Sequence, residues 1–353
     1  QEQEEQEEEE KEEEIKTKVI YGLGSGDSYL LLDVLPSSLV ENIFDNLNNE
    51  IDWNIMNHKG NQVPRLISIQ GDIEEEINDT NNCFQPLYRH PADEQPLMVP
   101  WTPYARLCRD IVSKKINQRL NHALIQKYRS GKDNIGEHSD KTLDIELYSS
   151  VVNLSVGASR TMILKPKAEY SNCDIVSPNL ILPTKIERPT NTNLPSNQNQ
   201  NQNNLVTKDR IYQKITLPHN SVFVLGWQTN RDYLHSIRQD KRLAVEKRPD
   251  ELLYNETRIS LTFRAISTFV NPRNGEIIGQ GALKKDRWLK ENRECTEQEQ
   301  SLRMLNAFSS ENRLSNFDWE EEYGCGFDIV NFAFLNSSSK LQSELEIKNK
   351  YEV

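Results

Sequence analysis

The segment NHALIQKYRSGKDNIGEHSD, residues 121–140, combines the pattern of a strand with a candidate metal-ligand motif. Residues 123–128 form an apolar run that is followed by a turn at Gly131, which predicts a short strand. The segment then ends with His138 and Asp140. Side chains two residues apart on a strand share a face, so both groups can reach one metal ion.

Short strand patterns of this kind recur along the rest of the chain. Each run is bounded by Gly, Asn, Asp or Pro, and many short strands with such turn signals favour a sandwich or jelly roll. Apolar residues at helical spacing predict one helix that begins near Pro36 and a second within residues 99–120. The expected fold is mainly β with flanking helices, an α+β protein. Further strands are expected at residues 150–156, 161–164, 222–225 and 260–266.

A third ligand and two arginines follow the His-x-Asp motif. His235 comes shortly after the apolar run 222–225, at an expected strand end. Two histidines and one aspartate can hold Fe(II) and leave its opposite face open. Arg258 and Arg264 lie at even spacing in RISLTFR, so both side chains share one face, and buried arginines require an anion. Because an arginine can bind an acidic co-substrate bidentately, these residues predict an oxygen-activating enzyme.

Several motifs also occur in the order found in one known family. Residues 121–140, SVVNLSVGASR at 150–160, HNSVFVLG at 219–226, His235-Ser236 and RISLTFR are similar to the AlkB family of Fe(II)/2-oxoglutarate dioxygenases. The resemblance covers roughly residues 27–270 with two insertions. The ordered set is far more specific than any one motif.

The resemblance implies a double-stranded β-helix, or jelly roll, that uses Fe(II), 2-oxoglutarate and O₂. It implies that His138, Asp140 and His235 ligate the iron and serve catalysis. It also implies that Arg258 pairs with the distal carboxylate of 2-oxoglutarate. Arg264, the fourth expected catalytic residue, would lie near the other end of the co-substrate and beside the metal aspartate.

Further co-substrate contacts are implied by the same resemblance. Tyr128 is expected to donate a hydrogen bond to 2-oxoglutarate. Gln126 and Ser260 stand at two contact positions where the family often has asparagine. Lys141 and Thr142 follow the His-x-Asp motif, where many relatives have acidic residues that help to read the base. The base preference of those relatives therefore does not transfer to this chain.

The activity implied by the resemblance is oxidative removal of N-alkyl groups from nucleobases in DNA or RNA, as in DNA repair or RNA demethylation. The alternative is a different Fe(II)/2-oxoglutarate hydroxylase, acting on protein side chains or on another modified base. A non-enzymatic interaction protein is disfavoured, because a disused site has no reason to keep five costly polar groups together. The basic stretch 106–132 fits either a phosphate-binding groove or a solvated helix face. Arg65 lies in a segment, Val63-Pro64-Arg65, that is similar to the family's nucleic-acid-handling region, and it is an expected substrate contact. Tyr88 and Trp101 are candidates for base stacking or strand wedging, and either could equally be a core residue. Arg129 and Lys132, beside the metal motif, are expected at phosphates.

Composition divides the chain into three parts and one insertion. Residues 1–14 contain ten glutamates against one lysine, so most of the net charge of −12 lies there. Such a run cannot bury apolar surface, and residues 1–18 are expected to form a disordered acidic tail, with contact to basic proteins as the alternative function. A dioxygenase domain is expected at 19–272, interrupted by an Asn/Gln-rich insertion at 166–208, and a C-terminal extension at 273–353.

Cysteine usage and hydropathy bear on the compartment. The five cysteines are scattered, which fits free thiols in a reducing compartment. No apolar run approaches the roughly 20 residues that cross a bilayer, so no membrane partner is expected. The chain begins at Gln1 and shows no apolar leader, so secretion is not expected. We expect a monomer in the nucleus or cytoplasm.

Overall fold

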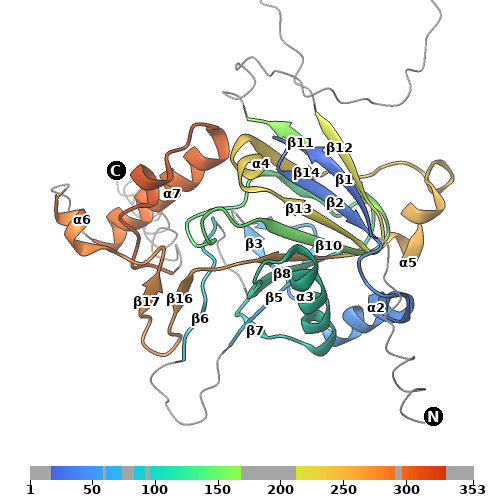
Figure 1. Cartoon of the computed structure of the whole chain (residues 1–353), viewed down its shortest axis with the longest axis horizontal. Helices are drawn as coiled ribbons and strands as arrows, with labels where there is room; N and C mark the ends of the chain where they lie inside the picture. The colour runs from blue at the N-terminus through green and yellow to red at the C-terminus, as the bar shows by residue number, and fades with distance from the viewer. Residues whose placement is uncertain are drawn as a thin grey trace, which may run out of the picture.

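Two β-sheets that face each other enclose the central core of the protein (Figure 1). The computed structural model describes residues 17–58, 61–73, 83–91, 96–167, 212–290 and 296–330. The large sheet contains, in spatial order, β1 (Lys18–Leu23), β2 (Ser28–Leu32), β13 (Ser221–Leu225), β10 (Val151–Gly157), β15 (Arg258–Arg264), β8 (His122–Tyr128), β5 (Leu66–Gly71) and β7 (Val99–Pro100). The small sheet contains β12 (Gln213–Leu217), β11 (Arg160–Pro166), β14 (Tyr233–Ile237) and β9 (Ile135–His138).

Strand β13 shows why the layers stack in this way. Its residues Val222 and Val224 join the apolar cluster beneath the helices, whereas Phe223 and Leu225 join the cluster between the two sheets. Successive side chains of a strand point to opposite faces, so a continuous apolar run fills both layers. The expected jelly roll, mainly β with flanking helices, is confirmed.

Helices α2 (Ser37–Glu50) and α3 (Pro103–Ile116) cover the outer face of the large sheet (Figure 1). Each helix buries apolar residues at helical spacing, as an amphipathic helix on a core must. Pro103 begins α3, where its missing N–H leaves no hydrogen bond unmade. Asn117 ends the helix in the left-handed conformation, with φ of 52°. Both predicted helices are confirmed, and the second is shorter than the stretch 99–120 that was expected to contain it.

The C-terminal part of the described chain packs at one end of the two sheets (Figure 1). Trp288 and Phe308 share one apolar cluster with Leu143, which follows the metal-ligand motif. Arg89 and Asp144 form a fully buried ion pair at 2.7 Å, and the guanidinium also donates to three carbonyl groups of the C-terminal part. Losing either charge would leave the other unpaired in the interior. The three bonds from Arg89 to these carbonyl groups join the C-terminal part to the jelly roll. The elements here are β16 (Thr268–Val270), β17 (Ile277–Gly279), α6 (Lys285–Lys290), α7 (Glu297–Arg313) and α8 (Trp319–Tyr323), with β6 (Gln85–Pro86) paired to β16.

Two of the domain boundaries expected from the sequence differ from the structure. Lys18 is the first residue of β1, and the expected acidic tail therefore ends before it. Pro166 ends β11 and Lys167 is buried, so the insertion begins after them. The rest of the expected tail and insertion, and residues 331–353 of the extension, lie outside the described residues.

Short elements connect these layers. They are β3 (Asn57–His58), β4 (Asn61–Gln62), α4 (Trp227–Asp232), α5 (Leu253–Glu256) and the 3-10 turns η2 (Ala244–Glu246) and η3 (Pro249–Glu251).

Within the described ranges, every helix is too short or too polar to cross a membrane.

Candidate metal centre and pocket

The three side chains predicted as metal ligands lie together in the structure. His138, Asp140 and His235 each offer one ligand atom, and these atoms lie within 4.8 Å of one another. His138 ends β9 and is paired directly with His235 in β14. Directly paired residues on antiparallel strands have neighbouring side chains, which explains how two histidines far apart in sequence meet. Two expectations were wrong: Asp140 lies beyond β9 and not on a strand, and His235 lies within its strand and not at its end.

Three side chains from separate parts of the chain fix the position of Asp140. Its N–H donates to Asn230 Oδ1 at 2.9 Å, and Asn230 Nδ2 donates to its carbonyl at 2.9 Å. The Tyr88 hydroxyl donates to Oδ1 at 3.1 Å, and Arg264 forms a buried ion pair with the same oxygen. Oδ2 remains, 3.5 Å from Nε2 of His235. One carboxylate oxygen is thus held by the protein and the other is available to a metal ion.

The protonation states of the three groups suit metal binding. Burial, together with the nearby His235, lowers the pKa of His138 to about 3, and burial lowers the pKa of His235 as well. Burial alone would raise the pKa of Asp140, but Arg264 and the two histidines bring it below its ordinary value. Nδ1 of His138 lies 2.8 Å from the Gly136 carbonyl. This contact keeps the proton on Nδ1 and leaves Nε2 to ligate a metal.

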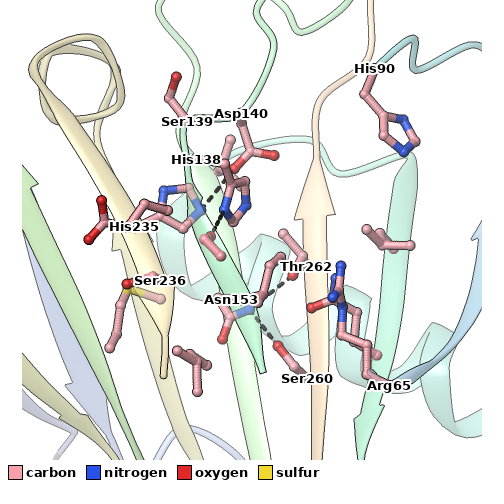
Figure 2. A pocket seen from close by; sticks show the side chains of 18 of the residues that line it. Arg65, His90, His138, Ser139, Asp140, Asn153, His235, Ser236, Ser260 and Thr262 are labelled. Atoms are coloured by element: carbon pink, nitrogen blue, oxygen red, sulfur yellow. Dashed lines mark hydrogen bonds and ion pairs between the residues drawn. The ribbon is translucent and has the colours of Figure 1, made fainter. Parts of the chain in front are cut away.

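A pocket of about 500 Å³ opens beside the three ligands (Figure 2). Its walls come from the inner faces of both sheets, and its size lies in the range of small-molecule sites. Gln126, Tyr128 and Ser260, the predicted co-substrate contacts, all line it. Within the pocket the Tyr128 hydroxyl donates to Gln126 Oε1 at 2.9 Å. The structure therefore places these three residues where a co-substrate can reach them.

Arg258 adjoins the pocket with part of its guanidinium unbonded. The side chain is fully buried, and Nη2 donates to Oδ1 of Asn153, which lines the pocket, at 2.9 Å and to Ser155 Oγ at 2.8 Å. Nε and Nη1 have no hydrogen-bond partner within the described chain. Burial lowers the pKa of Arg258 to about 10, which still leaves it charged at neutral pH. A buried, incompletely bonded cation is unfavourable unless an anion completes it, so the residues fit a dicarboxylate beside a divalent ion.

A comparison with protein families agrees with this geometry. The sequence model of the 2OG-Fe(II) oxygenase superfamily matches residues 27–264. The chain belongs to this superfamily. Membership implies Fe(II), 2-oxoglutarate and O₂, and the ligand group and Arg258 are the residues that fit the first two.

The relatives of this 2OG-Fe(II) oxygenase include DNA demethylases. DNA oxidative demethylase ALKBH2 of Bos taurus is 25% identical over 167 residues, which are 47% of this chain and 45% of that protein. The Homo sapiens protein of the same name is 26% identical over 167 residues, 47% of this chain and 48% of its own length. The chain thus spans about half the length of the curated relatives it matches. The solved structure of OsALKBH1 is 13% identical with a TM-score of 0.36, and the match covers 70% of this chain and 100% of that one. The AlkB-like family expected from the motifs is confirmed.

Asn153 is a residue of the oxygenase pocket that the motifs did not single out. Its Nδ2 donates to Ser260 Oγ at 2.6 Å and to Thr262 Oγ1 at 2.9 Å, both on β15 (Figure 2). Its Oδ1 accepts from Arg258, so this amide connects the buried guanidinium to the pocket. A signal was available in the sequence: Asn153 and Ser155 lie at even spacing in an otherwise apolar strand, which indicates a polar stripe on the inner face.

The residues predicted to contact substrate fall into two groups. Arg65 and Tyr88 line the pocket. Tyr88 is nevertheless buried and bonded to the carboxylate of the metal ligand, so it supports the metal centre. Trp101 is buried in the core beneath the helices and lies outside the pocket lining, so the stacking role was wrong and the core alternative is correct. Arg129 pairs with a carboxylate four residues on and Lys132 is exposed, and both lie outside the lining. A large aromatic side chain gains more from the core than from solvent, which explains the error at Trp101.

The basic stretch 106–132 lies mostly away from the pocket. Most cations of α3 are exposed, and the helix packs against the outer face of the large sheet, whereas the pocket opens on the inner face. This placement favours a solvated helix face over a groove for phosphates next to a bound base. The exposed cations of the helix and of the turn after it are Arg106, Lys114, Lys115 and Arg119.

Proposed function

We propose that the protein is a dioxygenase that oxidatively removes N-alkyl groups from nucleobases in DNA or RNA. One observation carries the oxygenase part of the proposal: a two-histidine, one-aspartate group lines a pocket, and Asn153 of the same lining is bonded to a buried arginine that has no anion among the described residues. The nucleobase part is supported by the relatives, which are DNA oxidative demethylases by name.

Each polar residue of the site would have a separate role in the reaction. When bound, Fe(II) supplies a site for O₂ activation, coupled to decarboxylation of 2-oxoglutarate to succinate and CO₂. His138, Asp140 and His235 would hold the ion from one side. Arg258 would bind the distal carboxylate of the co-substrate bidentately. Arg264 neutralises Asp140 and keeps that carboxylate in one orientation. Hydroxylation of the N-alkyl carbon gives a hemiaminal, which collapses to an aldehyde and the unmodified base.

The pocket also offers a face for a flat base. Met56, Val63 and Leu124 line one side of it and belong to a single apolar cluster. A nucleobase must leave its stack to reach an enclosed site, and apolar side chains are suited to cover the extruded ring. The apolar wall and the ligand group border the same space, so a base held there would lie near the ligands.

The proposal is tested with a panel of single- and double-stranded oligonucleotides that carry N-methylated bases. We expect succinate and formaldehyde to form together when Fe(II), 2-oxoglutarate and a methylated strand are all present. The Asp140→Ala protein should give neither product, because the ion loses its protein carboxylate. Succinate formation without loss of the methyl group from any strand would favour a hydroxylase of protein side chains or of another base. Unchanged turnover in His138→Ala would exclude both enzymes.

We further propose that the protein acts in the nucleus or cytoplasm. The buried Cys108 thiol forms no disulfide bond. Free thiols and a ferrous cofactor both suit a reducing compartment. Imaging of a tagged full-length protein tests this assignment, and secretion into the medium would contradict it.

A further inference from the structure

The C-terminal helix α7, which lies outside the family match, contributes a side chain to the pocket. Asn312 lines the pocket next to the metal-ligand loop. Its Oδ1 accepts hydrogen bonds from the backbone and hydroxyl of Ser139, at 3.0 and 3.1 Å, and from Lys141 Nζ at 2.6 Å. Because all three donors bond to Oδ1, the orientation of the amide is determined, and Nδ2 points away from Ser139 and Lys141. Nδ2 has no hydrogen-bond partner within the described residues, so it remains available as a donor to a ligand.

A second unused donor lies elsewhere in the lining. Arg65 is only 7% exposed, yet it lines the pocket and its Nε has no partner within the described chain. Its Nη1 donates to the Asn134 carbonyl at 3.1 Å, which positions the guanidinium. Figure 2 shows Arg65 across β15 from Asn153. A buried guanidinium with an unmade hydrogen bond favours a ligand that brings an acceptor.

The charged residues of the lining also favour a ligand that brings hydrogen-bond acceptors. Among the described residues, Glu137 and Asp140 are the carboxylates that line the pocket. Asp140 pairs with Arg264, and Glu137 lies 2.5 Å from Lys165 Nζ. Arg65 and Lys141 add two cationic side chains to the lining. Within the described part of the chain, the lining therefore offers hydrogen-bond donors and positive charge, and both of its carboxylates are already paired.

We propose that the pocket selects neutral N-alkylated imide bases, of which 3-methyluracil and 3-methylthymine are the simplest, over cationic bases such as 3-methylcytosine and 1-methyladenine. An imide carries a carbonyl acceptor on each side of the alkylated nitrogen, and so matches donors such as Asn312 Nδ2 and Arg65 Nε. The cationic bases present an exocyclic amine beside the alkylated nitrogen and bring a positive charge to a lining that already carries two. This inference rests on the proposed nucleobase demethylation and specifies its substrate.

The test compares two oligonucleotides that differ only in carrying 3-methyluracil or 3-methylcytosine, mixed in one reaction with the full-length Fe(II) enzyme. We expect the ratio of kcat/KM values to favour 3-methyluracil by roughly tenfold or more, the worth of a hydrogen bond to a charged or matched group. Fluorescence anisotropy of the same strands with Mn(II)-loaded protein, 2-oxoglutarate and no O₂ should show the same order of affinity. The anisotropy readout is independent of turnover.

The Asn312→Asp variant replaces the donor by a carboxylate of the same shape. It should move the ratio toward 3-methylcytosine by roughly tenfold. Asn306→Asp, an exposed position on the same helix, adds the same charge without reaching the pocket and should leave the ratio unchanged. A wild-type preference for 3-methylcytosine, or equal use of both strands, would overturn the inference while leaving demethylation intact. An unmoved ratio in folded Asn312→Asp would also overturn it. If neither strand is bound or turned over, the proposed function fails first.

Discussion

Replacing Arg258 by methionine separates a co-substrate anchor from a structural arginine. The guanidinium is fully buried and donates to Asn153 and Ser155, whereas Nε and Nη1 have no partner in the part of the chain that the structure describes. Methionine fills a similar space without charge or donors. If the arginine is kept for 2-oxoglutarate, the substitution should reduce binding of the co-substrate and leave the apoprotein as stable as before, or more stable.

The magnitudes follow from the contacts. Each unsatisfied buried donor costs about 1–3 kcal/mol, and each hydrogen bond contributes about 0.5–1.5 kcal/mol. Removing the two unsatisfied donors of Arg258 therefore offsets the loss of its two hydrogen bonds. We therefore expect the unfolding free energy of Arg258→Met to lie within about 1 kcal/mol of the wild type, or above it. A bidentate charge-assisted pair with a carboxylate is worth about 3 kcal/mol, so the affinity for 2-oxoglutarate should fall on the order of 150-fold.

Two measurements and one matched control complete the test. Urea denaturation of the metal-free protein gives the stability, and calorimetric titration of 2-oxoglutarate into the Mn(II) form without O₂ gives the affinity. Arg160 is the control, because it is also buried beside Tyr128 but donates to three carbonyl groups. Arg160→Met should lose about 2–4 kcal/mol of stability, with little change in co-substrate affinity in the folded protein. If Arg258→Met instead unfolds easily and binds 2-oxoglutarate normally, the anchor has been misassigned.

Three further predictions concern the metal centre and the insertion. Asn230→Ala should weaken Mn(II) binding about tenfold, because the residue fixes the Asp140 backbone from both sides; an unchanged calorimetric Kd would show that the clamp is dispensable. The Mn(II) affinity should change less than about twofold between pH 8 and pH 6, because the pKa of His138 is about 3 and that of His235 is lowered, so protons compete only in more acidic solution. Two histidines with ordinary pKa values would instead lose about 16-fold over that interval, and a titration series in matched buffers distinguishes the two. Replacing residues 168–211 by a short Gly/Ser linker should keep iron-dependent turnover within about twofold, because β11 and β12 are hydrogen-bonded neighbours whose ends lie close together; loss of activity in a folded variant would give the insertion a role.

The C-terminal part shows what sequence motifs leave out. The Asn312 amide and the Arg89–Asp144 pair join residues that are far apart in the chain. An asparagine near the end of a polar helix gives no local sign that it will line a pocket. The family match stops at residue 264, and hence no motif reaches α7.

The sequence by itself determined the layered β fold and the identity of the three candidate metal ligands. Apolar runs with turn residues at their ends form strands largely independently of their surroundings. The residue types of the His-x-Asp motif and of the two arginines are sufficient to indicate iron and a carboxylate as ligands. Only the tertiary structure decided which polar groups complete the site. Three asparagines contribute to the site only because folding brings them next to residues that are distant in the sequence: Asn153, Asn230 and Asn312. Trp101 is kept away from the pocket by its packing in the core. Strand formation depends on local pattern, whereas a hydrogen bond between distant residues depends on how the finished layers are positioned.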